Sequence, residues 1–248
     1  MTHLLVLSGT GEARRLLAQL ATNPTIRITA SLAGATDRPA ALGVETRIGG
    51  FGGVEGLAKW CDGNAVDAII DLTHPYAAQM SRHAAALSVN LPVISYARPA
   101  WQAAKNDRWT EFENWKAMAA ALPAQARPFL AGGSRAVTAF VSRPDLWLLA
   151  RGQKFNDDFK KYNHLKLIND FPKKQIEDEK ALLTEYGISH ICAKNSGGNW
   201  SFAKIEAARQ LDLPVWFLAR PDFQKGDQHY QICHSLEDVT AAIKAIIG

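Results

Sequence analysis

Short apolar runs of β-type residues alternate with segments of helical period along almost the whole chain. In the first half, the strand-like runs LLVLS, IRITASLAG, VETRIGG, VDAIIDL and LPVISYA are interspersed with the helix-like segments EARRLLAQL, VEGLAKWC and YAAQMSRHAAALS. Strands that are joined through helices pair in parallel, and the helices then cover both faces of the sheet. The pattern therefore predicts an α/β fold built on a parallel sheet.

The alternation restarts in the second half of the chain. It runs through RPFLAG, SRAVTAFVS, LWLLARG, QIEDEKALLTEYG, ISHICAKNS, FAKIEAARQL and LPVWFLARP to a closing helix, SLEDVTAAIKAII. Two strand ends also resemble each other, LPVISYARPAW at 91–101 and LPVWFLARPDF at 213–223. We therefore expect two Rossmann-like domains, 1–123 and 124–248, and we interpret the polar, tryptophan-rich segment 98–128 as the crossover, with the boundary near Pro123.

Composition narrows the class of partner. The 248 residues are 47% hydrophobic and hold no apolar run of the roughly 20 residues that cross a membrane, so we expect a cytoplasmic protein with no membrane partner. The three cysteines form no CxxC pair, which predicts reduced thiols and no metal site. The net charge of +4 is spread along the chain, which favours an anionic small molecule over nucleic acid. We expect a monomer or a weak oligomer.

Glycines follow the first strand-like run. In LLVLSGTGEARRLL, Gly9 and Gly11 lie between a strand and a helix, where backbone N–H groups and the helix dipole favour a phosphate. Ser8 and Thr10 add hydroxyl donors, whereas Arg14 stands where a full dinucleotide fingerprint has its third glycine. The turn is either a cofactor site or a plain tight turn.

Two later turns point to the same kind of ligand. The end of the second strand, SLAGATDRP, has no acid for a ribose hydroxyl, and Ser31, Thr36 and Arg38 suit a 2′-phosphate, which favours NADP over NAD. An ordinary polar turn is the alternative. The loop GGFGG at 49–53 permits positive φ and the close approach of a ligand, or is merely flexible.

A polar group interrupts IIDLTHPYAAQMS where a buried strand gives way to a helix. Thr73, His74 and Tyr76 lie at the carboxyl end of the fourth strand, and we expect Pro75 to open the helix. The ordinary pKa of histidine, near 6.5, makes His74 a candidate proton donor. The alternative role for His74 is to shape the turn through backbone hydrogen bonds.

The segments LSGTGEARRLL, SLAG, GGFGG, DLTHPYA and RPAW occur in this order, and KNSGG with SFAKIEAARQLDLPVWFLARP follows in the second half. Together they resemble the precorrin-6A reductase family of cobalamin biosynthesis over about residues 4–221. The resemblance implies a two-domain reductase that uses NADPH to reduce one double bond of the precorrin-6A macrocycle and gives precorrin-6B. This chain has Ala35 where relatives often carry arginine, Tyr76 where they often carry phenylalanine, and Asn195 where they often carry aspartate.

The resemblance and the chemistry of the residues together give the expected site. The expected cofactor-binding residues are Ser8, Gly9, Thr10, Gly11, Glu12, Ser31, Gly34, Thr36, Arg38, Gly50, Phe51, Gly52, Thr73, His74 and Pro75. The expected catalytic residues are His74, Tyr76 and Lys194, and the expected substrate-binding residues are Arg98, Trp101, Lys194, Ser196, Gly197 and Lys204.

The implied substrate is a tetrapyrrole polycarboxylate, which calls for several cations in a wide crevice to which the second domain contributes. Five cations lie near strand ends or in the KNSGG turn: Arg98, Arg151, Lys194, Lys204 and Arg220. Each of them is alternatively a solvated surface charge, Trp101 is alternatively a packing residue, and Ser196 or Ser201 is alternatively a helix cap. Two other functions stay open: a different NADP-dependent α/β oxidoreductase, or a nucleotide-binding sensor without turnover.

Overall fold

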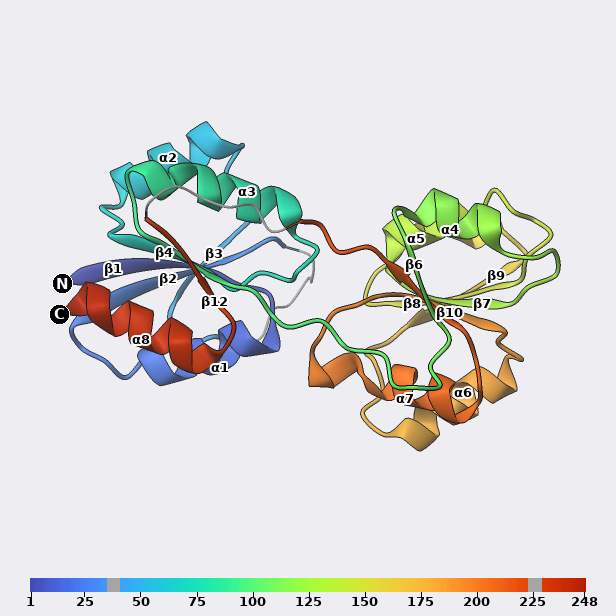
Figure 1. The fold of residues 1–248 in the computed structure, drawn as a ribbon. Coiled ribbons are helices and arrows are strands. Elements are labelled where there is room, and N and C mark those ends of the chain that lie inside the picture. Colours follow the sequence, from blue (N-terminus) through green and yellow to red (C-terminus); the bar gives the residue numbers. More distant parts are fainter. Residues whose placement is uncertain (35–40, 223–228) are drawn as a thin grey trace. The chain divides into compact units, whose positions relative to one another are not determined.

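The computed structural model describes residues 1–34, 41–222 and 229–248. Its contacts divide the chain into a first unit, Met1–Pro99 with Pro221–Gly248, and a second unit, Ala100–Arg220. Within the described residues each unit holds a six-stranded parallel sheet with helices on both faces (Figure 1), so the predicted α/β class is confirmed. No helix in these ranges is long and apolar enough to span a bilayer.

The sheet of the first unit has the strand order β12-β5-β4-β1-β2-β3. Helices α1 and α8 cover one face and helices α2 and α3 the other (Figure 1). The bounds are β1 Thr2–Leu7, α1 Gly11–Leu20, β2 Ile26–Leu32, β3 Glu45–Ile48, α2 Val54–Gly63, β4 Ala68–Asp71, α3 Ala78–Ala86, η1 Leu87–Val89, β5 Val93–Tyr96, β12 Tyr230–Cys233 and α8 Leu236–Ile247.

The sheet of the second unit has the strand order β6-β11-β10-β7-β8-β9. Helices α4 and α5 cover one face and helices α6 and α7 the other (Figure 1). The bounds are β6 Trp109–Phe112, α4 Trp115–Ala121, β7 Pro128–Ala131, α5 Ser134–Phe140, β8 Leu148–Gly152, η2 Asp157–Lys161, β9 Leu165–Asn169, α6 Ile176–Glu185, β10 His190–Lys194, η3 Asn199–Ser201, α7 Ala203–Gln210 and β11 Val215–Leu218.

The two sheets repeat one topology and exchange their last strands. Strands β7 to β11 occupy the same places in their sheet as β1 to β5 in theirs, whereas β6 completes the second sheet and β12 the first. The boundary predicted near Pro123 is therefore wrong. The segment interpreted as a crossover contains β6 and α4 of the second unit, and the end of the chain returns to the first.

Alternate side chains of the central strands enter opposite core layers. Leu4 and Val6 of β1 pack toward α1 and α8, whereas Leu5 and Leu7 pack toward α2 and α3. Because both faces are covered, such strands are apolar throughout, which is why they are visible in the sequence. All three cysteines are buried free thiols.

The strands that the sequence pattern missed are β6, β9 and β12, and each lies at the edge of a sheet. An edge strand is short and half-exposed, so it lacks a continuous apolar run. Helix α3 also differs from its prediction, because Pro75 lies in a turn and the helix begins at Ala78.

Candidate functional site

The order of the first sheet reverses between β1 and β4. These strands are neighbours, and the chain continues from β1 toward β2 but from β4 toward β5. Open α/β sheets bind ligands in the crevice at the carboxyl ends of two such strands. The turn Ser8–Glu12 follows β1 and the segment Thr73–Tyr76 follows β4, so both lie at this position. The loop after β3 is farther from β4 than we expected, because β1 and β2 intervene.

Hydrogen bonds fix the glycine turn after β1 to both neighbouring strands. Gly9 has a φ of +130°, and the backbone N–H of Ser8 donates to the carbonyl of Ser31 over 2.9 Å. The Thr10 hydroxyl donates to the carbonyl of Leu72 over 2.9 Å, and its oxygen accepts the N–H of Ala13 as the cap of α1. The turn therefore presents the N-terminus of a ten-residue helix, a position that favours an anion.

A carboxylate in the first turn of α1 is paired with a buried cation. Glu12 forms an ion pair with Arg98, which follows β5 and is buried. A carboxylate at this end of a helix repels a phosphate bound there, and the guanidinium offsets that charge. Arg98, which we expected to bind a substrate carboxylate, is thus engaged by a carboxylate of the protein itself.

The glycine-rich loop before α2 has a backbone that only glycine adopts without strain. Gly49, Gly52 and Gly53 have φ angles of +112°, +83° and +98°. The ring of Phe51 meets Trp60 edge-on, with ring centroids 5.7 Å apart. Of the other residues expected to bind the cofactor, Gly34 follows β2 and has a φ of +77°, whereas Thr36 and Arg38 lie outside the described residues.

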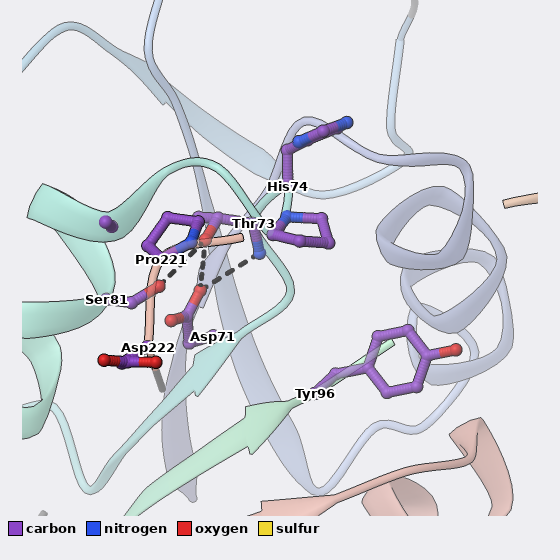
Figure 2. Close-up of a pocket in the computed structure, with 9 residues that line it drawn as sticks. Asp71, Thr73, His74, Ser81, Tyr96, Pro221 and Asp222 are labelled. Carbon is purple, nitrogen blue, oxygen red and sulfur yellow. Dashed lines mark hydrogen bonds between the residues drawn. The ribbon is translucent and has the colours of Figure 1, made fainter. Parts of the chain in front are cut away.

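A pocket opens beside the end of β4 (Figure 2). Asp71 is buried, and its Oδ1 accepts the N–H and the hydroxyl of Thr73 over 3.0 and 2.7 Å. The Thr73 and Ser81 hydroxyl oxygens lie 3.3 Å apart. The lining residues are Asp71, Thr73, His74, Pro75, Ala78, Ser81, Tyr96, Pro221 and Asp222.

Four polar residues of this pocket escaped the sequence prediction: Asp71, Ser81, Tyr96 and Asp222. Only Asp71 carried a signal, as an acid at the end of an otherwise apolar strand. Burial, with Glu12 as a second cause, raises the pKa of the Tyr96 phenol, so it keeps its proton at neutral pH.

His74 takes part in the turn that it begins. Its Nδ1 accepts the backbone N–H of Tyr76 over 3.3 Å, and its carbonyl accepts the N–H of Ala77 over 2.7 Å. The imidazole is directed away from the Asp71, Thr73 and Ser81 group (Figure 2), and its centroid lies 5.7 Å from that of Tyr76. These contacts favour the turn-shaping role.

The corresponding position of the second sheet carries a cluster of cations. Lys194 ends β10, which pairs with β7, and Arg135 lies in the first turn of α5, directly after β7. Burial, and then the charge of Arg135, lowers the pKa of Lys194. In the following turn Gly197 has a φ of +70°. Helix α7 begins only at Ala203 and has no side-chain cap, so neither Ser196 nor Ser201 caps it.

Asn195 holds Trp101 in place. Its Oδ1 accepts the N–H of Trp101 over 2.8 Å, and its Nδ2 donates to the carbonyl of Trp101 over 3.1 Å. The indole packs against Phe202 and Phe217, with centroids at 5.5 and 6.1 Å. These contacts assign Trp101 a packing role.

Three charged residues are buried together in the second unit. Arg151 Nη2 donates to Glu179 Oε1 over 2.8 Å, and the two side chains are 4% and 0% exposed. Lys204 is 4% exposed, donates to the carbonyl of Ser201 over 2.6 Å and lies 5.2 Å from the Trp101 ring. Their burial argues against a direct contact of Arg151 or Lys204 with a substrate, contrary to our expectation.

Burial lowers the pKa of Lys204 to about 7. Because the unfolded lysine binds its proton more tightly, stability should rise with pH between about 7 and 10. We expect the stability advantage of the wild type over Lys204→Met to grow by about 2–2.5 kcal/mol between pH 7.5 and 9.5, measured by urea unfolding. The control is Lys160→Met, at an exposed lysine. Its free energy of unfolding should change with pH as that of the wild type does. A constant difference between wild type and Lys204→Met would contradict the lowered pKa.

A parallel sheet with a glycine turn at its switch point, leading into a helix N-terminus, defines the class of α/β proteins that bind nucleotides there. Comparison with known families makes the assignment more specific. The model of the family described as precorrin-6x reductase CbiJ/CobK matches residues 3–244, so the chain belongs to that family of oxidoreductases.

Individual relatives are similar in sequence over almost the whole chain. A precorrin-6A reductase of Rhodococcus erythropolis is 37% identical over 98% of this chain and 96% of its own. One of Rhodobacter capsulatus is 38% identical over 96% of this chain and 94% of its own. A solved structure of a CobK precorrin-6A reductase, 37% identical, superposes with a TM-score of 0.90 and covers 99% of this chain and 97% of that one.

Proposed function

We propose that this protein uses NADPH to reduce one double bond of precorrin-6A, giving precorrin-6B. The observation that carries the proposal is the full-length match to precorrin-6A reductases at 37–38% identity. The switch-point turns of the first unit supply an independent reason to expect a dinucleotide.

The residues of the first unit fit a nicotinamide dinucleotide. The Gly9 to Glu12 turn suits the pyrophosphate, because its positive φ and capped helix direct backbone N–H groups to one place. Gly34, Gly50, Phe51 and Gly52 follow the next strands of the sheet. Thr73 and Pro75 lie beside the turn, where Thr10 is bonded to Leu72. When bound, the cofactor supplies a hydride, and the protein orients the reactants and excludes water.

On the substrate side we propose Lys194, with Ser196 and Gly197, as the carboxylate-binding group of the second unit. Lys194 and Arg135 place two positive charges at the carboxyl edge of β7 and β10, and an anion near both relieves their repulsion. Arg135 is exposed at this edge, unlike Arg151.

The reduced macrocycle needs a proton, for which Tyr76, Lys194 and the pocket residue Tyr96 are the proposed donors, because the contacts of His74 favour its turn-shaping role. We expect His74→Asn, whose Oδ1 replaces Nδ1 as the acceptor of the Tyr76 N–H, to keep most activity, whereas His74→Ala loses about tenfold through weaker cofactor binding. The pH profile of kcat should keep its form in both variants. Loss of one limb of that profile in His74→Asn would instead identify His74 as the acid.

The natural substrate is proposed to be metal-free. The relatives named for precorrin-6A are 37–38% identical, whereas a cobalt-precorrin-6A reductase of Priestia megaterium is 29% identical over 96% of this chain.

The deciding experiment is anaerobic incubation of the protein with NADPH and precorrin-6A, in which NADPH absorbance and the product spectrum are followed. We expect stoichiometric NADPH oxidation with formation of precorrin-6B. A parallel reaction with the cobalt form tests the choice of substrate. Absence of turnover, although NADPH and precorrin-6A both bind, would exclude the reductase and favour a nucleotide-binding sensor.

A further inference from the structure

Arg47 lies beside Ser31 at the carboxyl end of β2. The two residues are direct partners in the pairing of β2 with β3, and Arg47 Nη1 donates to Ser31 Oγ over 2.8 Å. Ser31 is in turn tied to the glycine turn, since its carbonyl accepts the N–H of Ser8 over 2.9 Å. The guanidinium is therefore connected to the turn that suits the pyrophosphate.

The guanidinium is held rigidly. Nη1 also donates to the carbonyl of Gly49 and Nη2 to that of Gly50, both over 2.9 Å. Its Cζ lies 3.7 Å from the centroid of the Phe51 ring. A stacked and doubly anchored guanidinium loses little conformational freedom when it binds a ligand, which favours affinity.

The anchored guanidinium keeps donors for a ligand. Arg has five N–H groups, and the three bonds to protein oxygens leave Nε–H and one Nη2–H without a partner in the described part of the chain. In the same ranges no carboxylate forms an ion pair with Arg47. The half-buried cation thus has its charge and two donors available.

The adenine ribose of a dinucleotide lies at the end of the second strand of such a sheet. An acid there binds the free 2′-hydroxyl of NAD and repels a phosphate, whereas a nearby arginine accommodates the 2′-phosphate of NADP. Residues 26–34 contain no acid, and the cation next to Ser31 is Arg47.

We propose that Ser31 and Arg47 form the binding site for the 2′-phosphate and make this enzyme selective for NADPH over NADH. The proposal rests on the proposed function, which assigns the dinucleotide to the first unit. Arg47 was absent from the residues expected from the sequence, because its place beside Ser31 depends on the register between β2 and β3.

Equilibrium binding tests this site without the macrocyclic substrate. NADPH, NADH and 2′,5′-ADP are titrated by calorimetry against the full chain and its variants. We expect Arg47→Gln to weaken the binding of NADPH and 2′,5′-ADP by about 30-fold and the binding of NADH by less than about 3-fold. Arg47→Lys, which keeps the charge but not the fork, should fall between wild type and Arg47→Gln, and Ser31→Ala should weaken NADPH by about 5-fold.

Phe51→Leu tests the stacking separately, because it removes the ring that holds the guanidinium but keeps the cation itself. It should weaken the binding of NADPH and 2′,5′-ADP more than that of NADH, but by less than Arg47→Gln does. Equal losses of affinity for NADPH and NADH in Arg47→Gln and Arg47→Lys would overturn the 2′-phosphate site. The proposed dinucleotide site of the first unit would still stand. Wild-type protein that binds neither NADPH nor NADH would overturn the proposed function itself.

Discussion

Glu179→Ala should lower the free energy of unfolding of the second unit by about 3–5 kcal/mol. Glu179 is fully buried in α6, and its Oε1 accepts both Arg151 Nη2 and the backbone N–H of Lys173, each over 2.8 Å. Removing the carboxylate leaves the Arg151 guanidinium without its counter-charge at a site that water does not reach. The cost of an uncompensated buried charge exceeds that of a cavity of similar size.

Urea unfolding followed by tryptophan fluorescence measures this loss, because every tryptophan except Trp60 lies in the second unit. Glu177→Gln is the matched control. Glu177 lies two residues earlier in α6, its side chain is 78% exposed, and it pairs with Lys180 over 3.3 Å. Exposed pairs contribute less than about 1 kcal/mol, so the control should unfold nearly as the wild type does. Similar midpoints for the two variants would show that Glu179 does not neutralise Arg151.

The buried layers of the fold could be predicted from the sequence, and the edges of the sheets could not. Strands such as β1, β4 and β10 are covered on both faces, so LLVLS, VDAIIDL and ISHICAKNS read as apolar runs between helices. In β12, the sequence YQIC places the exposed residues Gln231 and Ile232 between the partly buried Tyr230 and the buried Cys233, so it shows neither an apolar run nor an alternation, and only its pairing with β5 makes it a strand. The exchange of β6 and β12 between the sheets leaves no local signal, since each pairs with a strand more than 100 residues away in the sequence.

The candidate site likewise has features that could be predicted from the sequence and features that could not. Glycines and hydroxyls mark the turns after β1, β3 and β4, because backbone geometry and capping are local properties of the chain. The charge pairs are not local. Arg98 meets Glu12, and Arg151 meets Glu179, only through the order of the strands. From the sequence alone, a cation at a strand end can therefore be interpreted either as a ligand contact or as the counter-ion of a buried carboxylate. Burial of its side chain in the structure indicates the second role.

The loop GGFGG depends on a glycine outside it. Gly56, in the first turn of α2, faces the backbone of Phe51 so closely that a Cβ atom there would lie 1.8 Å from the Phe51 carbonyl oxygen. We expect Gly56→Ala to displace the loop and weaken NADPH binding by about 30-fold, since displacements near 1 Å have effects of this size. The overpacking should also cost about 1–3 kcal/mol of stability.

Gly63→Ala separates this effect from a change in the helix alone. Gly63 ends the same helix, and a Cβ there meets no atom within 4 Å, so this variant should bind NADPH as the wild type does. It should gain up to about 1 kcal/mol of stability, because alanine restricts the unfolded chain. Calorimetric titration of both variants with NADPH gives the comparison. If Gly56→Ala binds NADPH as tightly as Gly63→Ala does, the loop does not contact the cofactor, and the anchoring of Arg47 by Gly49 and Gly50 serves the fold rather than the nucleotide.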